Sequence, residues 1–185
     1  MDCLLCTSKN CKVSGKDCPG TREETLDLYR EGEVRETYAG ADRLVSGGRA
    51  GTLSRVDEIL EYSKIRGYKN IGIAYCFSME KEAETFRALL KKAGFKTYSY
   101  RCTINGLKEG EMCPGLPGGV NCNPLGQADA INREPAELIN EMGLCLGHDI
   151  LFHGHLQKPF TVLAVKDRVY GHNPLKALSA GKKDG

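Results

Sequence analysis

The sequence predicts an α/β domain of Rossmann or flavodoxin type, a three-layer sandwich around a parallel sheet of about four strands. From residue 52 onward, short apolar runs alternate with amphipathic segments, which is the pattern of repeated strand–helix units. Cysteines end three of the apolar runs, namely Cys76, Cys102 and Cys145. We divide the chain of 185 residues into a cysteine-rich metal-binding head with a linker helix, 1–48, and the Rossmann-like domain, 49–185.

The head is too polar to form a core of its own. Residues 1–20 carry Gly, Lys and Ser between their cysteines, so we expect metal binding or docking to order them. An amphipathic pattern within 22–45 predicts a helix followed by a less regular connection. The glycine-rich stretch 47–51 predicts a flexible break before the main domain.

The first half of the main domain reads as helix, strand, helix, strand. Apolar residues at helical spacing follow two N-cap candidates, Thr52 and Ser54, and Gly67 ends this helix. A strand is expected at 69–75. The next helix, at about 78–93, is closed by Gly94 as a left-handed cap, and a second strand follows at 95–101.

A long loop separates these elements from the second half. The segment 103–119 is rich in Gly and Pro and longer than most connections, so we expect it to be functional or mobile and to cover the site. Pro124 suits the first turn of a helix running to about residue 132. We then expect a strand at 137–144, a helix beginning near 147–149 and a strand at 160–165.

Composition excludes several classes of protein. The 26 basic and 24 acidic side chains give a net charge of +2, too balanced for a nucleic-acid-binding surface, and there is no Trp for base stacking. No apolar stretch approaches the roughly 20 residues that a membrane span requires. Nine cysteines, an odd number, without a hydrophobic signal segment argue against a secreted disulfide scaffold. We therefore expect a soluble cytoplasmic protein that binds neither nucleic acid nor membrane.

The head contains the first candidate metal site. Its cysteines have the spacing C-x2-C-x4-C-x6-C and are followed by Pro19. A close CxxC pair with two further thiols in a short segment can surround a zinc ion or hold a [4Fe–4S] cluster. The pattern favours a metal without choosing between the two. The ligands would be Cys3, Cys6, Cys11 and Cys18.

A second group of cysteines is dispersed in sequence and would be assembled by the fold. Parallel strands end at one edge of the sheet, where open α/β folds bind their ligands. We expect a preorganised cofactor site there, formed by Cys76, Cys102, Cys122 and Cys145. For each of these the alternative is a buried thiol that only packs. Cys113, in the long loop, is a candidate ligand, a resolving thiol or a bystander.

Polar residues follow the third and fourth strands. His148 is a candidate general acid or base, and Asp149 either assists it or caps the helix that begins there. Lys166 and Arg168 could hold a carboxylate or phosphate, or simply lie in a solvated turn. No Gly-x-Gly-x-x-Gly motif follows the first strand, so dinucleotide binding is disfavoured.

Four motifs in this order resemble those of domain-of-unknown-function family 1847, a prokaryotic family labelled as metal-binding. They are GIAYC at 72–76, CNPLGQA at 122–128, GLCLGHD at 143–149 and VKDRVYGHNP at 165–174. The resemblance covers roughly residues 50–178 together with the head. It implies a cytoplasmic protein typical of anaerobes and matches Cys76, Cys122 and Cys145 to the family's pattern. It implies no particular reaction.

We interpret the chain as an iron–sulfur protein with a [4Fe–4S] cluster at the sheet edge and zinc or a second cluster in the head. With three core ligands, an open iron could act on a small sulfur-containing or anionic substrate, as in a desulfidase, lyase or oxidoreductase. With four cysteine ligands in the core, the site is closed and suits electron transfer with a redox partner protein, or metal storage. A third hypothesis is a thiol-redox protein with a structural zinc head, in which a helix N-terminus lowers the pKa of Cys76.

Overall fold

The computed structural model describes residues 2–180, and its contacts divide the chain into two compact units, Met1–Thr52 and Leu53–Gly185. The first unit contains α1 (Asn10–Val13), α2 (Arg22–Leu28), α3 (Gly32–Val45) and a 3-10 turn, η1 (Ser46–Gly48). Gly40 is its one buried residue among those described. The less regular connection expected after the first helix is wrong, because α3 occupies it. That this unit binds metal remains a prediction.

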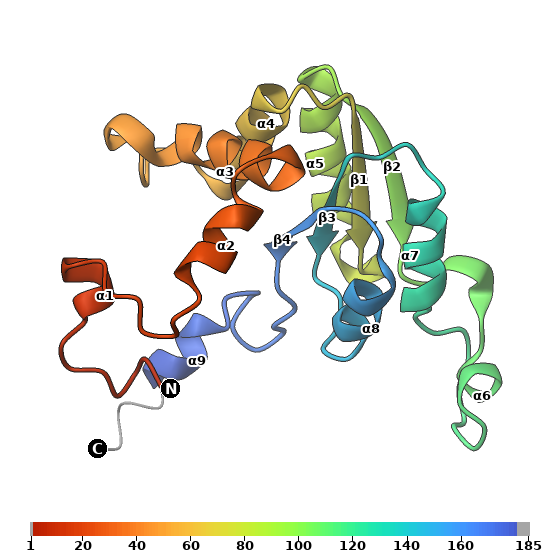
Figure 1. Cartoon of the computed structure of the whole chain (residues 1–185). Helices are drawn as coiled ribbons and strands as arrows, with labels where there is room; N and C mark the ends of the chain where they lie inside the picture. Colours follow the sequence, from red (N-terminus) through yellow and green to blue (C-terminus); the bar gives the residue numbers. More distant parts are fainter. Residues whose placement is uncertain (1, 181–185) are drawn as a thin grey trace. The chain divides into compact units, whose positions relative to one another are not determined.

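The second unit is built on a parallel sheet, which confirms the predicted fold class (Figure 1). Its strands are β1 (Asn70–Tyr75), β2 (Lys96–Arg101), β3 (Leu138–Met142) and β4 (Phe160–Ala164), in the order β2-β1-β3-β4. All neighbouring pairs are parallel. The chain leaves β1 toward β2 on one side and later returns to add β3 on the other. The carboxyl ends of β1 and β3 therefore flank the switch point of the sheet, the usual ligand position in this class.

Helices connect the strands largely where the sequence pattern placed them. They are α4 (Arg55–Ile65), α5 (Glu80–Lys92), α7 (Pro124–Asn132) and α8 (His148–His155), with a short α9 (Leu175–Ala180) at the end. The Ser54 hydroxyl accepts the Asp57 N–H, so Ser54 rather than Thr52 is the N-cap of α4. A 3-10 turn, η2 (Phe77–Met79), precedes α5. Gly94, with φ +94°, follows α5 as predicted.

Buried side chains form one cluster on each face of the sheet. Ile71 and Ile73 of β1 belong to a cluster with Phe86 and Leu90 of α5. On the other face, residues of α7 and α8 pack against the sheet, and the buried thiols belong to this second cluster. Its members include Ala74, Cys76, Cys102, Cys122, Ala128, Ile131, Ile139 and Phe152. Thus the core cysteines lie on the face that α7 and α8 cover.

The long loop after β2 forms an arm with short helical segments, η3 (Ile104–Gly106) and α6 (Glu109–Met112). Backbone hydrogen bonds close its base, including Asn121 N–H to the Leu107 carbonyl at 2.9 Å. In Figure 1 the arm projects beyond the end of β2 instead of lying across the strand ends, contrary to the expected cover. Within residues 2–180, none of the helices combines the length and apolar character needed to cross a bilayer.

Candidate thiol site at the carboxyl ends of the strands

Each core thiol lies just beyond a regular element. Cys76 follows β1, Cys102 follows β2, and Cys145 lies three residues beyond β3. Cys122 precedes α7 by two residues, in the segment that returns from the arm. The parallel arrangement brings these four segments to one edge of the sheet. Cys76, Cys102 and Cys122 are buried, Cys145 is partly exposed, and none is in a disulfide.

The structure brings three of the predicted ligands into contact with one another. The sulfur atoms of Cys102 and Cys122 are 3.3 Å apart, and Cys102 also hydrogen-bonds to Cys76. The Phe77 N–H points at the Cys102 sulfur, with a nitrogen–sulfur distance of 3.4 Å. The Cys76 sulfur lies 3.4 Å from the Ser78 hydroxyl. We call Cys76, Cys102 and Cys122 the thiol cluster.

The members of the thiol cluster differ in acidity. A hydrogen bond from Cys102 is the main cause that lowers the pKa of Cys76 to about 4; burial opposes this, and Ser78 and Lys166 contribute. The same hydrogen bond and burial raise the pKa of Cys102, which is therefore the protonated donor. Burial raises the pKa of Cys122. The thiol cluster therefore contains one thiolate, on Cys76, while Cys102 and Cys122 are protonated.

Two cations from the segment after β4 reach the other strand ends. The Lys166 ammonium donates to the Ser78 hydroxyl beside Cys76. The Arg168 guanidinium lies 3.7 Å from the Cys145 sulfur. Because β4 is separated from β1 by β3, Lys166 spans the carboxyl edge of β3. Both predicted anion-binding residues therefore lie at the site, one at each side of the switch point.

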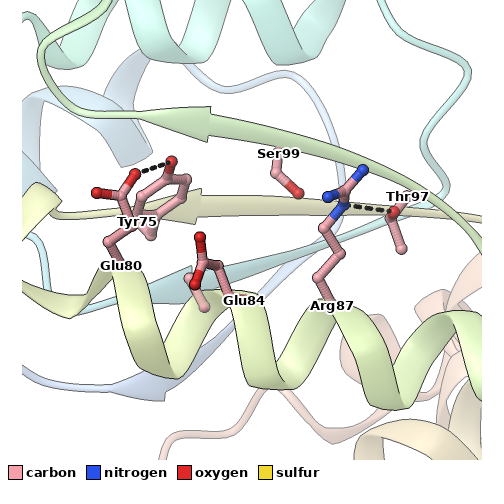
Figure 2. A pocket seen from close by; sticks show the side chains of 7 residues that line it. Tyr75, Glu80, Glu84, Arg87, Thr97 and Ser99 are labelled. Atoms are coloured by element: carbon pink, nitrogen blue, oxygen red, sulfur yellow. Dashed lines mark hydrogen bonds between the residues drawn. The ribbon is translucent and has the colours of Figure 1, made fainter.

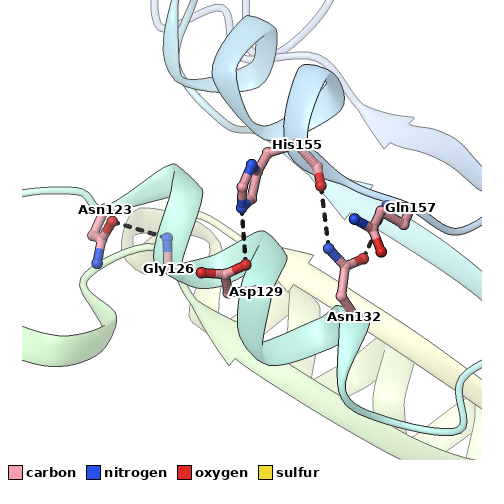
Figure 3. Close-up of polar contacts among 6 residues, drawn as sticks. All are labelled: Asn123, Gly126, Asp129, Asn132, His155 and Gln157. Carbon is pink, nitrogen blue, oxygen red and sulfur yellow. Dashed lines mark hydrogen bonds and ion pairs between the residues drawn. The ribbon is translucent and has the colours of Figure 1, made fainter.

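Helix α7 holds the backbone behind the thiols. The Asn123 N–H donates to the Cys102 carbonyl at 2.7 Å, and the Asn123 side chain caps α7 by accepting the Gly126 N–H (Figure 3). Gln127 is fully buried and its amide nitrogen donates to the carbonyls of Tyr75 and Tyr100, at 3.2 and 2.7 Å. Sequence reasoning missed Gln127. The sequence did contain a signal for it: Gln127 is a polar residue on the apolar helix face formed by residues 124, 128 and 131.

The predicted catalytic pair begins α8. The Asp149 carboxylate accepts the N–H groups of Gly147 and Ile150, at 3.1 and 2.7 Å, but the N-cap of α8 is Gly147, so the N-cap role predicted for Asp149 is wrong. The Nδ1 atom of His148 is buried without a hydrogen-bond partner among the described residues. His148 therefore has a buried ring nitrogen without a partner, and the next residue, Asp149, accepts both backbone N–H groups with one carboxylate oxygen, Oδ1.

Another titratable pair was missed from the sequence. Glu141 is 2 % exposed on β3, and its carboxylate lies 2.5 Å from Nε2 of His153 on α8. The register between β3 and β4 shifts at Glu141 and Met142, a bulge of the kind often found beside functional sites. The signal in the sequence was Glu141 itself, an acidic residue within an otherwise uncharged strand. His153 also stacks on Phe160, with ring centroids 4.2 Å apart.

The head cysteines stand apart in the described conformation. Cys3, Cys11 and Cys18 are exposed, and Cys6 is partly exposed. Backbone and hydroxyl hydrogen bonds from Lys9 and Ser8 lower the pKa of Cys6. Across residues 2–180, no three His, Cys, Asp or Glu side chains are arranged as a metal site, in the head or in the thiol cluster. Metal ligation at either place thus remains a prediction.

A separate groove of about 290 Å³ lies between α5 and the edge strand β2 (Figure 2). Its lining is polar and contains no cysteine. The Tyr75 hydroxyl contacts Glu80 at 3.3 Å at one end, and Arg87 contacts Thr97 at 3.4 Å at the other. The groove opens on the α5 face of the sheet, whereas the thiol cluster packs on the opposite face. We therefore treat it as separate from the thiol site.

The chain is similar to one protein family and to two curated proteins. A family model described as "Protein of unknown function (DUF1847)" matches residues 13–163. An uncharacterized protein of Methanocaldococcus jannaschii is 34 % identical over 184 residues, which cover 96 % of this chain and 93 % of that protein. A biotin synthase of Nitratidesulfovibrio vulgaris is 27 % identical over 99 residues, 54 % of this chain and 27 % of that enzyme. No solved structure matches.

Proposed function

Because the chain belongs to the DUF1847 family, whose description names no reaction, we propose its function from the thiol site: it is a metal-binding protein, and the thiol cluster holds an iron–sulfur cluster. One observation carries this proposal. Three unpaired thiols from three separate segments come together at the carboxyl edge of a parallel sheet, and Lys166 reaches the Ser78 hydroxyl beside one of them. Thiolates are the ligands that iron–sulfur clusters and zinc prefer.

The residues present fit such a group by their donor chemistry. The thiol cluster supplies three sulfur ligands, and Cys145 is a fourth candidate at the same edge. Cys102 and Cys122 now satisfy each other at 3.3 Å; metal binding would deprotonate them and replace that contact. Lys166 and Arg168 offset the negative charge that several thiolates would bring.

We propose that the site acts on a small anionic or sulfur-containing compound. A cluster held by three protein thiolates would supply an open iron as a Lewis acid when bound. Lys166 and Arg168 would orient the negative group of the compound, and His148 would hold or release a proton at Nδ1. Removal of sulfur from a thiolated compound is the reaction we would test first. If Cys145 is the fourth ligand, the cluster has no open iron, and we propose electron transfer or metal storage in place of catalysis.

A second candidate function is thiol–disulfide exchange. The 3.3 Å contact between the Cys102 and Cys122 sulfur atoms favours it, since a substrate disulfide could oxidise this pair with little movement, taking up the two electrons and two protons and leaving as two thiols. The low pKa of Cys76 supports it as well, because the thiolate is the reactive form of cysteine. Under this reading the metal, a structural zinc, would be confined to the head.

Metal and sulfide analysis of protein purified without oxygen separates the two candidates. We expect iron with acid-labile sulfide in the wild type, and a loss of at least half of it in Cys76→Ala, Cys102→Ala and Cys122→Ala. Cys113→Ala, at an exposed position on the arm, is the matched control and should keep its iron. Unchanged iron in all three variants would refute the cluster site. Zinc alone, with a disulfide that dithiothreitol reverses, would support thiol exchange.

A further inference from the structure

The segment after β4 carries both cations of the site, and a histidine further along the chain holds its backbone. Two peptide groups that flank Lys166 approach one ring nitrogen, Nδ1 of His172. The Asp167 N–H donates to this nitrogen at 3.2 Å, and the Val165 carbonyl oxygen lies 3.2 Å from it. Because these groups belong to the residues directly before and after Lys166, the imidazole fixes the backbone from which the Lys166 side chain extends.

Hydrogen bonds fix the backbone around Arg168 as well. The His172 N–H donates to the Asp167 carbonyl at 2.7 Å, on the side that precedes Arg168. The Asp167 carboxylate accepts the N–H groups of Val169 and Tyr170, at 3.0 and 2.9 Å, on the side that follows it. The Arg168 side chain therefore also extends from a backbone that His172 and Asp167 hold in place.

The backbone of His172 is unusual for its residue type. Its φ is +64°, and the preceding Gly171 has φ +60°. The Asn173 N–H donates to the Tyr170 carbonyl at 3.3 Å, so Gly171 and His172 are the central residues of a tight turn with positive φ at both positions. Such positions favour Gly and Asn, because a Cβ atom makes them strained for most other residues. Glycine would form this turn without strain, so the contacts of the imidazole ring are the reason for a histidine here.

The hydrogen bond from Asp167 also specifies the form of the His172 ring. A nitrogen that accepts the Asp167 N–H carries no proton, so the ring proton is on Nε2. With a proton on Nδ1, the ring would donate to the Val165 carbonyl instead, and the Asp167 N–H would lose this partner. The Oδ1 atom of an Asn at position 172 would take the place of Nδ1 and could accept the same N–H, whereas a Gly could not.

We propose that His172 is a positioning residue that directs Lys166 and Arg168 to the carboxyl edge of the sheet. There the Lys166 ammonium donates to the Ser78 hydroxyl, and the Arg168 guanidinium lies 3.7 Å from the Cys145 sulfur. This inference rests on the proposed function and deepens it, since these two cations are the groups that would orient the negative group of the substrate. The polar contacts of His172 go to the backbone of its own segment, so it acts through the two cations.

Alkylation of the metal-free, reduced protein at low salt tests this role, with iodoacetate as the anionic reagent and iodoacetamide as the neutral one. Peptide mass spectrometry gives both rates at Cys145, the thiol beside Arg168. Their ratio reports the local charge, because a loosened segment would raise both rates together. We expect His172→Gly, which keeps the turn without strain, to lower the iodoacetate-to-iodoacetamide ratio at least about threefold, because Arg168 no longer stays beside the sulfur. His172→Asn should keep at least about half of the wild-type ratio, since Oδ1 still accepts the Asp167 N–H.

Matched variants show whether the effect is local. Asn105→Gly changes another non-glycine residue with positive φ, +69°, on the arm, and should leave the ratio at Cys145 unchanged. The ratio at the exposed Cys113, measured in the same samples, should be the same in all variants. Arg168→Ala gives the full effect of losing this cation. Adding His172→Gly to it should lower the ratio at Cys145 no further, because His172 acts on this thiol through Arg168.

Three outcomes would overturn the positioning role: an unchanged ratio in His172→Gly, an equally low ratio in His172→Asn, or a further fall in the double variant. Iron and sulfide content, measured on protein that no chelator has treated, tests the proposed function separately. If His172→Gly lowers the ratio but the wild type holds no iron, the proposed function fails and the positioning role stands. If the wild type holds iron and the ratio does not change, the positioning role alone fails.

Discussion

The environment of Cys76 selects its charged form. A thiol donor, a hydroxyl and an ammonium group surround its sulfur, so its pKa falls to about 4 although burial acts in the opposite direction. The same hydrogen bond raises the pKa of Cys102, so Cys102 stays protonated. At neutral pH the thiol cluster therefore contains a preformed thiolate, which serves either metal ligation or nucleophilic exchange.

Ultraviolet titration of metal-free, reduced protein should reveal this thiolate. We expect an increase of thiolate absorbance near 240 nm with a midpoint near pH 4, because the Cys76 thiol loses its proton there. Cys76→Ser should remove this step, and Cys113→Ser, at the exposed arm position, should keep it. A step that survives in Cys76→Ser would assign the acidic thiol elsewhere.

Glu141 and His153 form the other unusual residue pair. Burial is the main cause that raises the pKa of Glu141, while the hydrogen bond with His153 acts to lower it. The folded protein thus holds this proton more tightly than the unfolded chain does. Stability from Glu141 is fully present below its ordinary pKa and is lost as pH rises through the folded pKa.

His153→Ala should therefore destabilise the protein more at about pH 8 than at about pH 5, because an ionised Glu141 would be left buried without a partner. At the higher pH we expect a loss of roughly 2 to 3 kcal/mol in urea unfolding, the low end for a broken buried pair because His153 is partly exposed. His155→Ala is the control: its pair with Asp129 is exposed, so we expect less than about 1 kcal/mol (Figure 3). Equal losses would contradict this assignment.

At the scale of elements, α7 holds the strand ends that carry two of the thiols. Gln127 bridges the carbonyls of Tyr75 and Tyr100, the residues one and two positions before Cys76 and Cys102. Its side chain is fully buried, so these bonds are shielded from water. Asn132, at the other end of α7, makes comparable bonds to the His155 carbonyl and the Gln157 N–H in an exposed setting (Figure 3).

Gln127→Ala should cost about 2 kcal/mol of unfolding free energy, because buried carbonyls lose a donor. Asn132→Ala should cost less than about 1 kcal/mol, since water can replace its partners. We also expect Gln127→Ala, but not Asn132→Ala, to lower bound iron, because the strand ends beneath Cys76 and Cys102 would shift. Equal stability and equal iron content of the two variants would show that α7 does not position the thiols.

At the scale of the whole molecule, the two units differ in what could stabilise them. The second has two buried clusters around its sheet, whereas Gly40 is the one buried residue described in the first. A unit with so little apolar burial depends on other interactions for its order. This agrees with the prediction that Cys3, Cys6, Cys11 and Cys18 hold a metal.

Chelation should therefore separate the units in hydrogen exchange. After treatment with a strong chelator, amides of residues 10–45 should exchange at least about tenfold faster, because metal binding and folding are coupled in small thiolate sites. Amides of β1 and β3 should stay protected, since their stability comes from the apolar core. Unchanged exchange in the helices of the first unit would mean that the head is ordered without metal.

The sequence predicted the sheet well because its signals are local. Ser54, Gly94 and Pro124 act on the chain within a few residues of themselves, so the starts of α4 and α7 and the end of α5 could be read directly. The less regular connection expected after the first helix within 22–45 is wrong, because Gly32–Val45 form the helix α3. The arm was misjudged for another reason: its base is fixed by backbone bonds between residues 107 and 121, which composition does not reveal.

The sequence by itself determined the fold class and the gathering of cysteines at one sheet edge, since parallel strands must end together. Only the tertiary structure decided which thiols touch. It joins Cys76, Cys102 and Cys122, leaves Cys145 beside Arg168, and turns Lys166 toward Ser78. It also buries Glu141 and Gln127 against groups distant in the chain. Such contacts depend on packing between elements, and packing is a property of the folded whole, which no local pattern encodes.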